Sequence, residues 1–121
     1  GKNAKPLVGT QWHLVRVMER DLQIAPEDFI FTFDADGHFG GKGACNRMMG
    51  SYTTTDNGGI TFGNVASTRM MCPNVDLEAE LSKILEDATH YEIDGDMLML
   101  LSNGEMQAVF QAVEASAKSD K

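Results

Sequence analysis

The sequence has few basic residues and no long apolar run. The 121 residues include 10 lysines and arginines against 18 aspartates and glutamates, which gives a formal net charge of -8 at pH 7. Proteins that bind nucleic acid neutralise phosphates with clustered Lys and Arg, so this composition argues against that class of partner. No stretch of about 18 apolar residues occurs, and the sequence therefore predicts no membrane-spanning helix.

Cysteine is equally scarce, because Cys45 and Cys72 are the only two. Two cysteines in an acidic chain do not fix the redox compartment. A disulfide between them would close a loop of about 28 residues and stabilise the fold by about 3.5 kcal/mol. The alternative is a pair of buried free thiols, and composition does not choose between the two.

Glycine is concentrated in one place, between Gly40 and Tyr52, where four of the 12 glycines fall within a single short stretch that also contains Cys45. Glycine serves positions of positive φ or close backbone approach. We therefore predict a tight, buried corner between two strands. The segment Thr68-Arg69-Met70-Met71-Cys72 repeats its Arg-Met-Met and cysteine pattern. This repetition predicts that the two segments meet, with the Cα atoms of the cysteines within about 7 Å.

Short strands and tight turns dominate the rest of the chain. Alternating apolar residues predict strands near 11–18, 29–33 and 38–39, with Trp12, Leu14 and Met18 on one face of the first. Asp-Gly and Asn-Gly turns then separate further strands, predicted at 51–55, 60–67, 91–94, 97–101 and 105–113. The polar segment 19–27 is expected to be a loop.

One segment carries a helical pattern instead. Its apolar residues recur with helical spacing and its charged residues, Glu78 among them, are assigned to the opposite face. We predict a helix over about 74–88, with Asn74 as N-cap. The stripe expected to lie on the sheet is Leu77, Leu81, Ile84, Leu85 and Ala88.

These elements define the expected fold class: mainly β with one helix (α+β), in a single domain. Tight turns join antiparallel neighbours, and seven to eight short strands approach the number that closes a small barrel. We predict a strongly bent antiparallel sheet or incomplete β-barrel covered by the helix. The domain should span residues 6–113, with flexible tails at 1–5 and 114–121.

Residues with chemical potential have simpler structural explanations. Cys45 could act as a nucleophile with His13, His38 or His90 as base, but no motif links them. A metal site of both cysteines and a histidine lacks a close-spaced ligand pair. The pairs Met48-Met49 and Met70-Met71 could bind cuprous ion, although adaptable core packing is the favoured interpretation. No catalytic residue, metal site or cofactor is predicted.

The two glycine and cysteine segments together resemble the META domain, or HslJ-like, family. The residues that carry the resemblance are Gly43, Cys45, Asn46, Gly50 and Tyr52, followed by Thr68, Met70 and Cys72, and the opening Gly9-Thr10-Gln11-Trp12 also fits. The resemblance covers about Pro6 to Val113 and gives these residues a structural role.

The resemblance implies a cell-envelope protein, in the periplasm or anchored to the outer membrane, often as a lipoprotein. It also implies an association with stress response, and with resistance to the antibiotic novobiocin. This chain contains neither a signal peptide nor a lipobox, so a lipid anchor and the peripheral membrane association it gives would lie outside it.

The first hypothesis is therefore a non-enzymatic envelope domain that binds an unidentified protein or other component, and a monomer is expected. A second is a carrier of a small apolar or lipid ligand, held in the mouth or seam of the barrel beneath the helix. A third is a thiol redox protein that uses Cys45 and Cys72.

Overall fold

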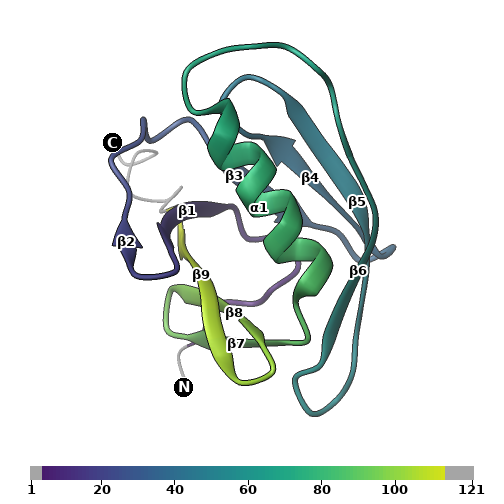
Figure 1. Cartoon of the computed structure of the whole chain (residues 1–121). Helices are drawn as coiled ribbons and strands as arrows, with labels where there is room; N and C mark the ends of the chain where they lie inside the picture. The colour runs from purple at the N-terminus through teal and green to yellow at the C-terminus, as the bar shows by residue number, and fades with distance from the viewer. Residues whose placement is uncertain (1–3, 114–121) are drawn as a thin grey trace, which may run out of the picture.

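The computed structural model describes residues 4–113 as one bent antiparallel sheet with a single helix across it (Figure 1). The helix α1 spans Val75–Asp87 and lies between the sixth and seventh strands in the chain. The strands are β1 (Trp12–Val17), β2 (Arg20–Asp21), β3 (Ile30–Phe33), β4 (His38–Lys42), β5 (Arg47–Thr54), β6 (Ile60–Ser67), β7 (His90–Asp94), β8 (Met97–Ser102) and β9 (Glu105–Ala112).

The sheet is unclosed. Its strand order is β6-β5-β4-β3-β1-β9-β8-β7, and the short β2 pairs with β1 at one side of this path. The two outermost strands, β6 and β7, approach at one end, where an isolated bridge joins Gly59 to His90. The predicted class is confirmed, with nine strands rather than seven or eight, because β2 forms in the segment expected to be a loop.

The helix packs as its apolar spacing predicts. Leu81, Ile84 and Leu85 are buried together with the neighbouring Leu77 and Ala88. Asn74 is the N-cap as predicted, but its side chain makes no capping hydrogen bond and its backbone is left-handed at φ 71°. Glu78 was assigned to the polar face and is in fact buried, with an exposed fraction of 4%.

A β-bulge in β1 changes which residues enter the core. The register with β9 shifts between Leu14 and Arg16, and this extra residue reverses the alternation of side chains beyond it. Val17 is therefore fully buried with Trp12 and Leu14, whereas Met18, predicted to share their face, is 39% exposed. The aromatic row Phe29, Phe31 and Phe33 is buried as its spacing predicts.

The glycine-rich stretch is more regular than predicted. Most of it belongs to β4 and β5, which pair Gly40 with Met49 and Gly41 with Met48. The irregular part is the short connection 43–46 between these strands. The predicted corner was thus too long, because most of its backbone groups are satisfied by the ladder.

One residue of the predicted N-terminal tail contacts the sheet region. The backbone N–H of Lys5 donates a hydrogen bond to the carbonyl of Gly95 at 2.8 Å, and the tail bounds 1–5 stay a prediction. The predicted tail 114–121 lies outside the described residues.

Candidate functional site

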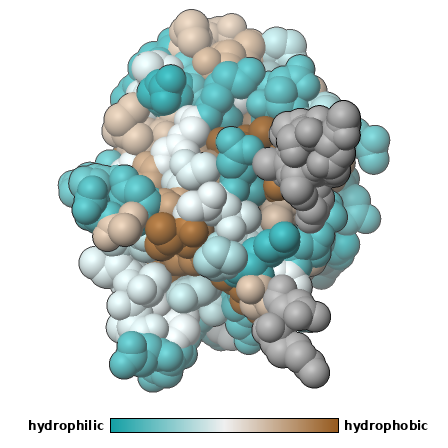
Figure 2. All heavy atoms as spheres, turned by 180° about the vertical axis from the view of Figure 1, so that it is seen from behind, coloured by the Kyte–Doolittle hydropathy of each residue, from teal (hydrophilic) through white to brown (hydrophobic). Residues whose placement is uncertain are grey.

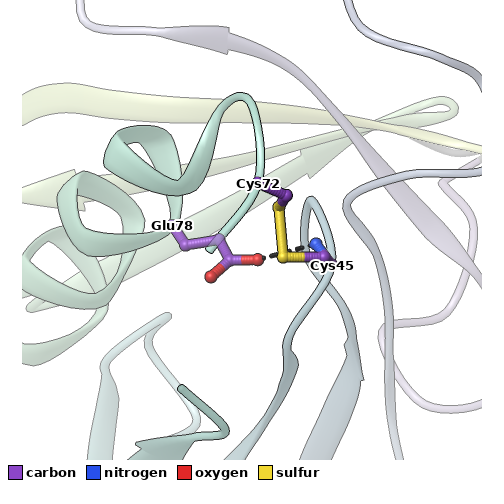
Figure 3. A group of neighbouring side chains, drawn as sticks. All are labelled: Cys45, Cys72 and Glu78. Carbon is purple, nitrogen blue, oxygen red and sulfur yellow. Dashed lines mark hydrogen bonds between the residues drawn. A yellow bond between two sulfur atoms is a disulfide. The ribbon is translucent and has the colours of Figure 1, made fainter. Parts of the chain in front are cut away.

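Three segments meet beside the N-terminal end of α1. The β4–β5 connection supplies Cys45, the loop that leads into the helix supplies Cys72, and the first turns of the helix supply Glu78 (Figure 3). Cys45 and Cys72 form a disulfide, and their Cα atoms are 6.4 Å apart. The structure therefore brings together the two cysteine segments that the repeated pattern singled out.

The Glu78 carboxylate binds the backbone of the β4–β5 connection. Its Oε2 accepts hydrogen bonds from the backbone N–H groups of Cys45 at 3.0 Å and Asn46 at 2.9 Å. Its Oε1 accepts a bond from the side-chain Nδ2 of Asn46 at 2.7 Å. A buried carboxylate without partners would be strongly unfavourable, and these donors explain how the site holds one.

These contacts set the ionisation of Glu78. Burial alone would raise the pKa of the carboxyl group, but the hydrogen bonds from the Asn46 side chain and the neighbouring backbone amides outweigh it and hold the pKa below its usual value. Glu78 is therefore a charged residue inside the fold at neutral pH.

Asn46 connects the same carboxylate to the loop after β6. Its Oδ1 accepts hydrogen bonds from Thr68 Oγ1 at 2.8 Å and from the Met70 N–H at 2.7 Å. Its Nδ2 also donates to the Met70 carbonyl at 3.0 Å. Both donors and both acceptor sites of the amide are thus used, and the side chain is 2% exposed.

Gly43 and Gly50 have neighbours so close that a side chain would clash with them. A Cβ atom on Gly43 would lie 2.8 Å from Glu78 Cγ and 2.9 Å from Glu78 Oε2. A Cβ atom on Gly50 would lie 2.8 Å from the Phe39 ring and 2.9 Å from the Gly63 carbonyl oxygen. Gly43 therefore belongs to the Glu78 cluster, whereas Gly50 serves packing within the sheet.

Tyr52 also makes its contacts elsewhere. Its hydroxyl donates to the Asp34 carbonyl, and its ring packs edge-on against Phe33 with centroids 5.0 Å apart. Burial, followed by the negative charge of Asp34, raises the pKa of the Tyr52 hydroxyl. Of the motif residues, Gly43, Cys45, Asn46, Thr68, Met70 and Cys72 are joined in one cluster, and Gly50 and Tyr52 are not.

The methionine pairs do not fill the core as predicted. Only Met48 is buried, whereas Met49, Met70 and Met71 are 43%, 55% and 84% exposed. The last two line an open groove of about 420 Å³ between the loop after β6 and α1. We call this the methionine groove, and its lining residues include Ser67, Thr68, Arg69, Met70, Met71, Ala79, Lys83 and Glu86.

Among the described residues, a small apolar space lies between the helix and the sheet. It is lined by Trp12, Leu81, Leu85 and several phenylalanines and measures about 10 Å³, which is room for about one water molecule. Large aromatic and leucine side chains occupy this interface, and the carriage of an apolar ligand stays a prediction.

Histidine does not take part in the cysteine cluster. Among the described residues, the side chain that joins Cys45 and Cys72 as a possible metal ligand is Glu78. Sequence reasoning missed this residue because it looked like a surface acid near a helix start. Its spacing of three and seven residues from Leu81 and Leu85, which places it beside the apolar stripe, was the available signal.

The architecture defines a class of small domain in which an unclosed antiparallel sheet wraps around one helix. Residues 5–115 match the META domain family, and the chain belongs to that family. Members are generally associated with the cell envelope. No helix within residues 4–113 has the length and apolar character needed to cross a membrane.

Three solved structures share the fold. One is an NMR structure of a protein whose sequence is 22% identical to this chain. The match covers 87% of this chain and 90% of that protein, with a TM-score of 0.68. An NMR structure from Burkholderia xenovorans is 24% identical, covering 89% and 84%, with a TM-score of 0.67. A crystal structure of a DUF4847 family protein from Bacteroides vulgatus is 18% identical, covering 88% and 93%, with a TM-score of 0.64. No curated protein matches the chain.

Proposed function

We propose that the chain is a non-enzymatic binding domain of the cell envelope, and that it holds an apolar segment of a partner protein in the methionine groove. The Cys45–Cys72 disulfide supports an oxidising compartment, because such bonds are rare where thiols are kept reduced. A lipid anchor and a role in stress or drug resistance belong to the same proposal, since the family resemblance implies both.

The observation that carries the proposal is the exposure of Met70 and Met71 on a loop that is firmly held. Methionine adapts its unbranched side chain to irregular apolar partners, and it is common on surfaces that bind many of them. Asn46 and the disulfide fix the backbone beneath these side chains. A fixed backbone lowers the entropy lost on binding, which favours association.

The opposite side of the molecule offers a useful comparison. Figure 2 shows it from behind relative to Figure 1, and outside the grey atoms it is mostly hydrophilic or neutral, with apolar colour confined to small patches. Large continuous apolar patches are the usual mark of a protein interface. We therefore assign the binding role to the groove.

A photo-crosslinking amino acid at Lys83, which lines the groove, tests the binding surface in intact cells of the source organism. We expect one discrete protein adduct, which is lost when Met70 and Met71 are both changed to Ser. The same crosslinker at the exposed Glu105, at the start of β9, is the control. Equal adducts from both positions, or adducts to lipid alone, would contradict the proposed surface.

The compartment is tested separately by alkylating thiols in acid-quenched cells. We expect Cys45 and Cys72 to resist alkylation until a reductant is added. Immediate alkylation of both would place the chain in a reducing compartment and would contradict the envelope assignment.

A further inference from the structure

We propose that reduction of the Cys45–Cys72 disulfide turns the cluster into a zinc site, with the two thiolates and the Glu78 carboxylate as protein ligands. The sulfur atoms and a Glu78 carboxylate oxygen all lie within 4.8 Å of one another (Figure 3). In the oxidised protein the two sulfurs are bonded to each other, so neither is a thiolate able to bind a metal.

The spacing suits a tetrahedral ion after a small movement. Zinc–sulfur bonds of about 2.3 Å place two thiolates about 3.8 Å apart, and a carboxylate oxygen about 3.5 Å from each of them. Breaking the disulfide lets the sulfurs separate to this distance by side-chain rotation. The Cα separation of 6.4 Å can remain as it is.

The surrounding hydrogen bonds keep the ligands together without the disulfide. Asn46 binds both the N–H and the carbonyl of Met70, two residues before Cys72, and Glu78 binds the N–H of Cys45. These bonds tie the two cysteine segments to each other and to α1. Reduction therefore leaves two neighbouring thiols instead of two separated ones.

The charges of the site favour a divalent cation. Among residues 4–113 no lysine, arginine or histidine pairs with the buried Glu78. Two thiolates beside this carboxylate would repel one another strongly unless a cation joined them. Asn46 would then orient the carboxylate ligand by its hydrogen bond, an arrangement common around protein metals.

The ligand types select zinc among the common ions. Thiolates disfavour calcium and magnesium, and a carboxylate disfavours cuprous copper. Both cysteines are partly exposed, so the ion has a path from solvent and water can complete the coordination.

A dithiol can serve as the reductant in this conversion. The dithiol gives two electrons and two protons to the Cys45–Cys72 bond and becomes a disulfide itself. Zinc then replaces the two thiol protons, which pass to solvent.

The test uses the whole chain after reduction with a phosphine, which is oxidised to its phosphine oxide. Cobalt(II) is the spectroscopic probe, and zinc is its competitor. We expect one equivalent of cobalt to give a thiolate-to-cobalt charge-transfer band, which zinc abolishes. The oxidised protein should give no such band. Cys45→Ser and Cys72→Ser should each lose the band, and Glu78→Gln should weaken zinc binding by at least about tenfold.

Glu86→Gln is the matched control, because Glu86 lies on the same helix and lines the groove but is exposed and outside the cluster. It should bind zinc as the unchanged protein does. X-ray absorption of the zinc-loaded unchanged protein covers the case in which Glu78→Gln does not fold, and should show two sulfur ligands with oxygen ligands.

Three results would overturn the proposal. They are no charge-transfer band in the reduced protein, unaltered zinc affinity in a folded Glu78→Gln variant, and four sulfur ligands, which would indicate an ion shared between two chains.

Discussion

The Asn46 side-chain amide donates a hydrogen bond to Oε1 of Glu78 over 2.7 Å, and both residues are almost completely buried. They are 32 positions apart in the chain, on the β4–β5 connection and on α1. This contact joins the β4–β5 connection to the helix. Asn46 also holds the loop after β6 in place through its hydrogen bonds to Met70. The stability of the cluster should depend strongly on both side chains.

We expect Asn46→Ala to destabilise the protein by at least about 3 kcal/mol. Truncation here leaves the Met70 N–H and an oxygen of Glu78 without a partner, at about 1–3 kcal/mol for each such group. Urea titration measures the free energy of unfolding. Asn57→Ala, in an exposed turn, is the control and should change it by less than about 0.5 kcal/mol.

The charge of Glu78 should make stability depend on pH. Its folded pKa is lowered, so its contribution is present above the unfolded pKa of about 4.3 and is lost as the pH falls through the lower folded value. Glu78→Gln should therefore be least stable relative to the unchanged protein at neutral pH, and the difference should shrink in acid. Denaturant titrations of both proteins between about pH 7 and about pH 3 measure it, and a constant difference would contradict the assignment.

Reduction of the disulfide should lower the free energy of unfolding by about 3.5 kcal/mol, because it releases a loop whose ends are 27 residues apart. The fold should persist, since hydrogen bonds from Asn46 and to Glu78 also hold this region. Denaturant midpoints with and without a reductant measure the loss. The Cys45→Ser, Cys72→Ser double variant should match the reduced protein and should not respond to reductant.

Gly43→Val should disrupt the same cluster by a different route. Even the Cβ atom would lie within 3 Å of two atoms of the Glu78 side chain, so the carboxylate must move away from its donors. We expect a loss of about 1–3 kcal/mol or more, measured by thermal or urea unfolding. Removing the obstructing atoms with Glu78→Ala provides a double-mutant cycle, in which the Gly43→Val effect should become smaller.

The fold could be predicted where local patterns coincide with burial. The stripe of Leu77, Leu81, Ile84 and Leu85 gave the helix and its buried face, and Asn103-Gly104 gave the last hairpin through residues of positive φ. The bulge in β1 could not be predicted, because it depends on pairing with β9, far away in the chain.

Only part of the site could be predicted from the sequence. The repeated cysteine segments correctly indicated a meeting point, since both carry the same residues. The roles of Glu78 and of the exposed methionines depend on tertiary contacts instead. A carboxylate in the first turns of a helix is usually exposed and a methionine pair is usually buried, and here the loop after β6 reverses both.

The β1–β9 ladder pairs the first strand of the sheet with the last. Trp12 pairs with Ala112 and Val17 with Ala108, in the middle of the sheet. During synthesis the sheet therefore cannot be completed until β9 has emerged, and contacts so distant in sequence slow folding.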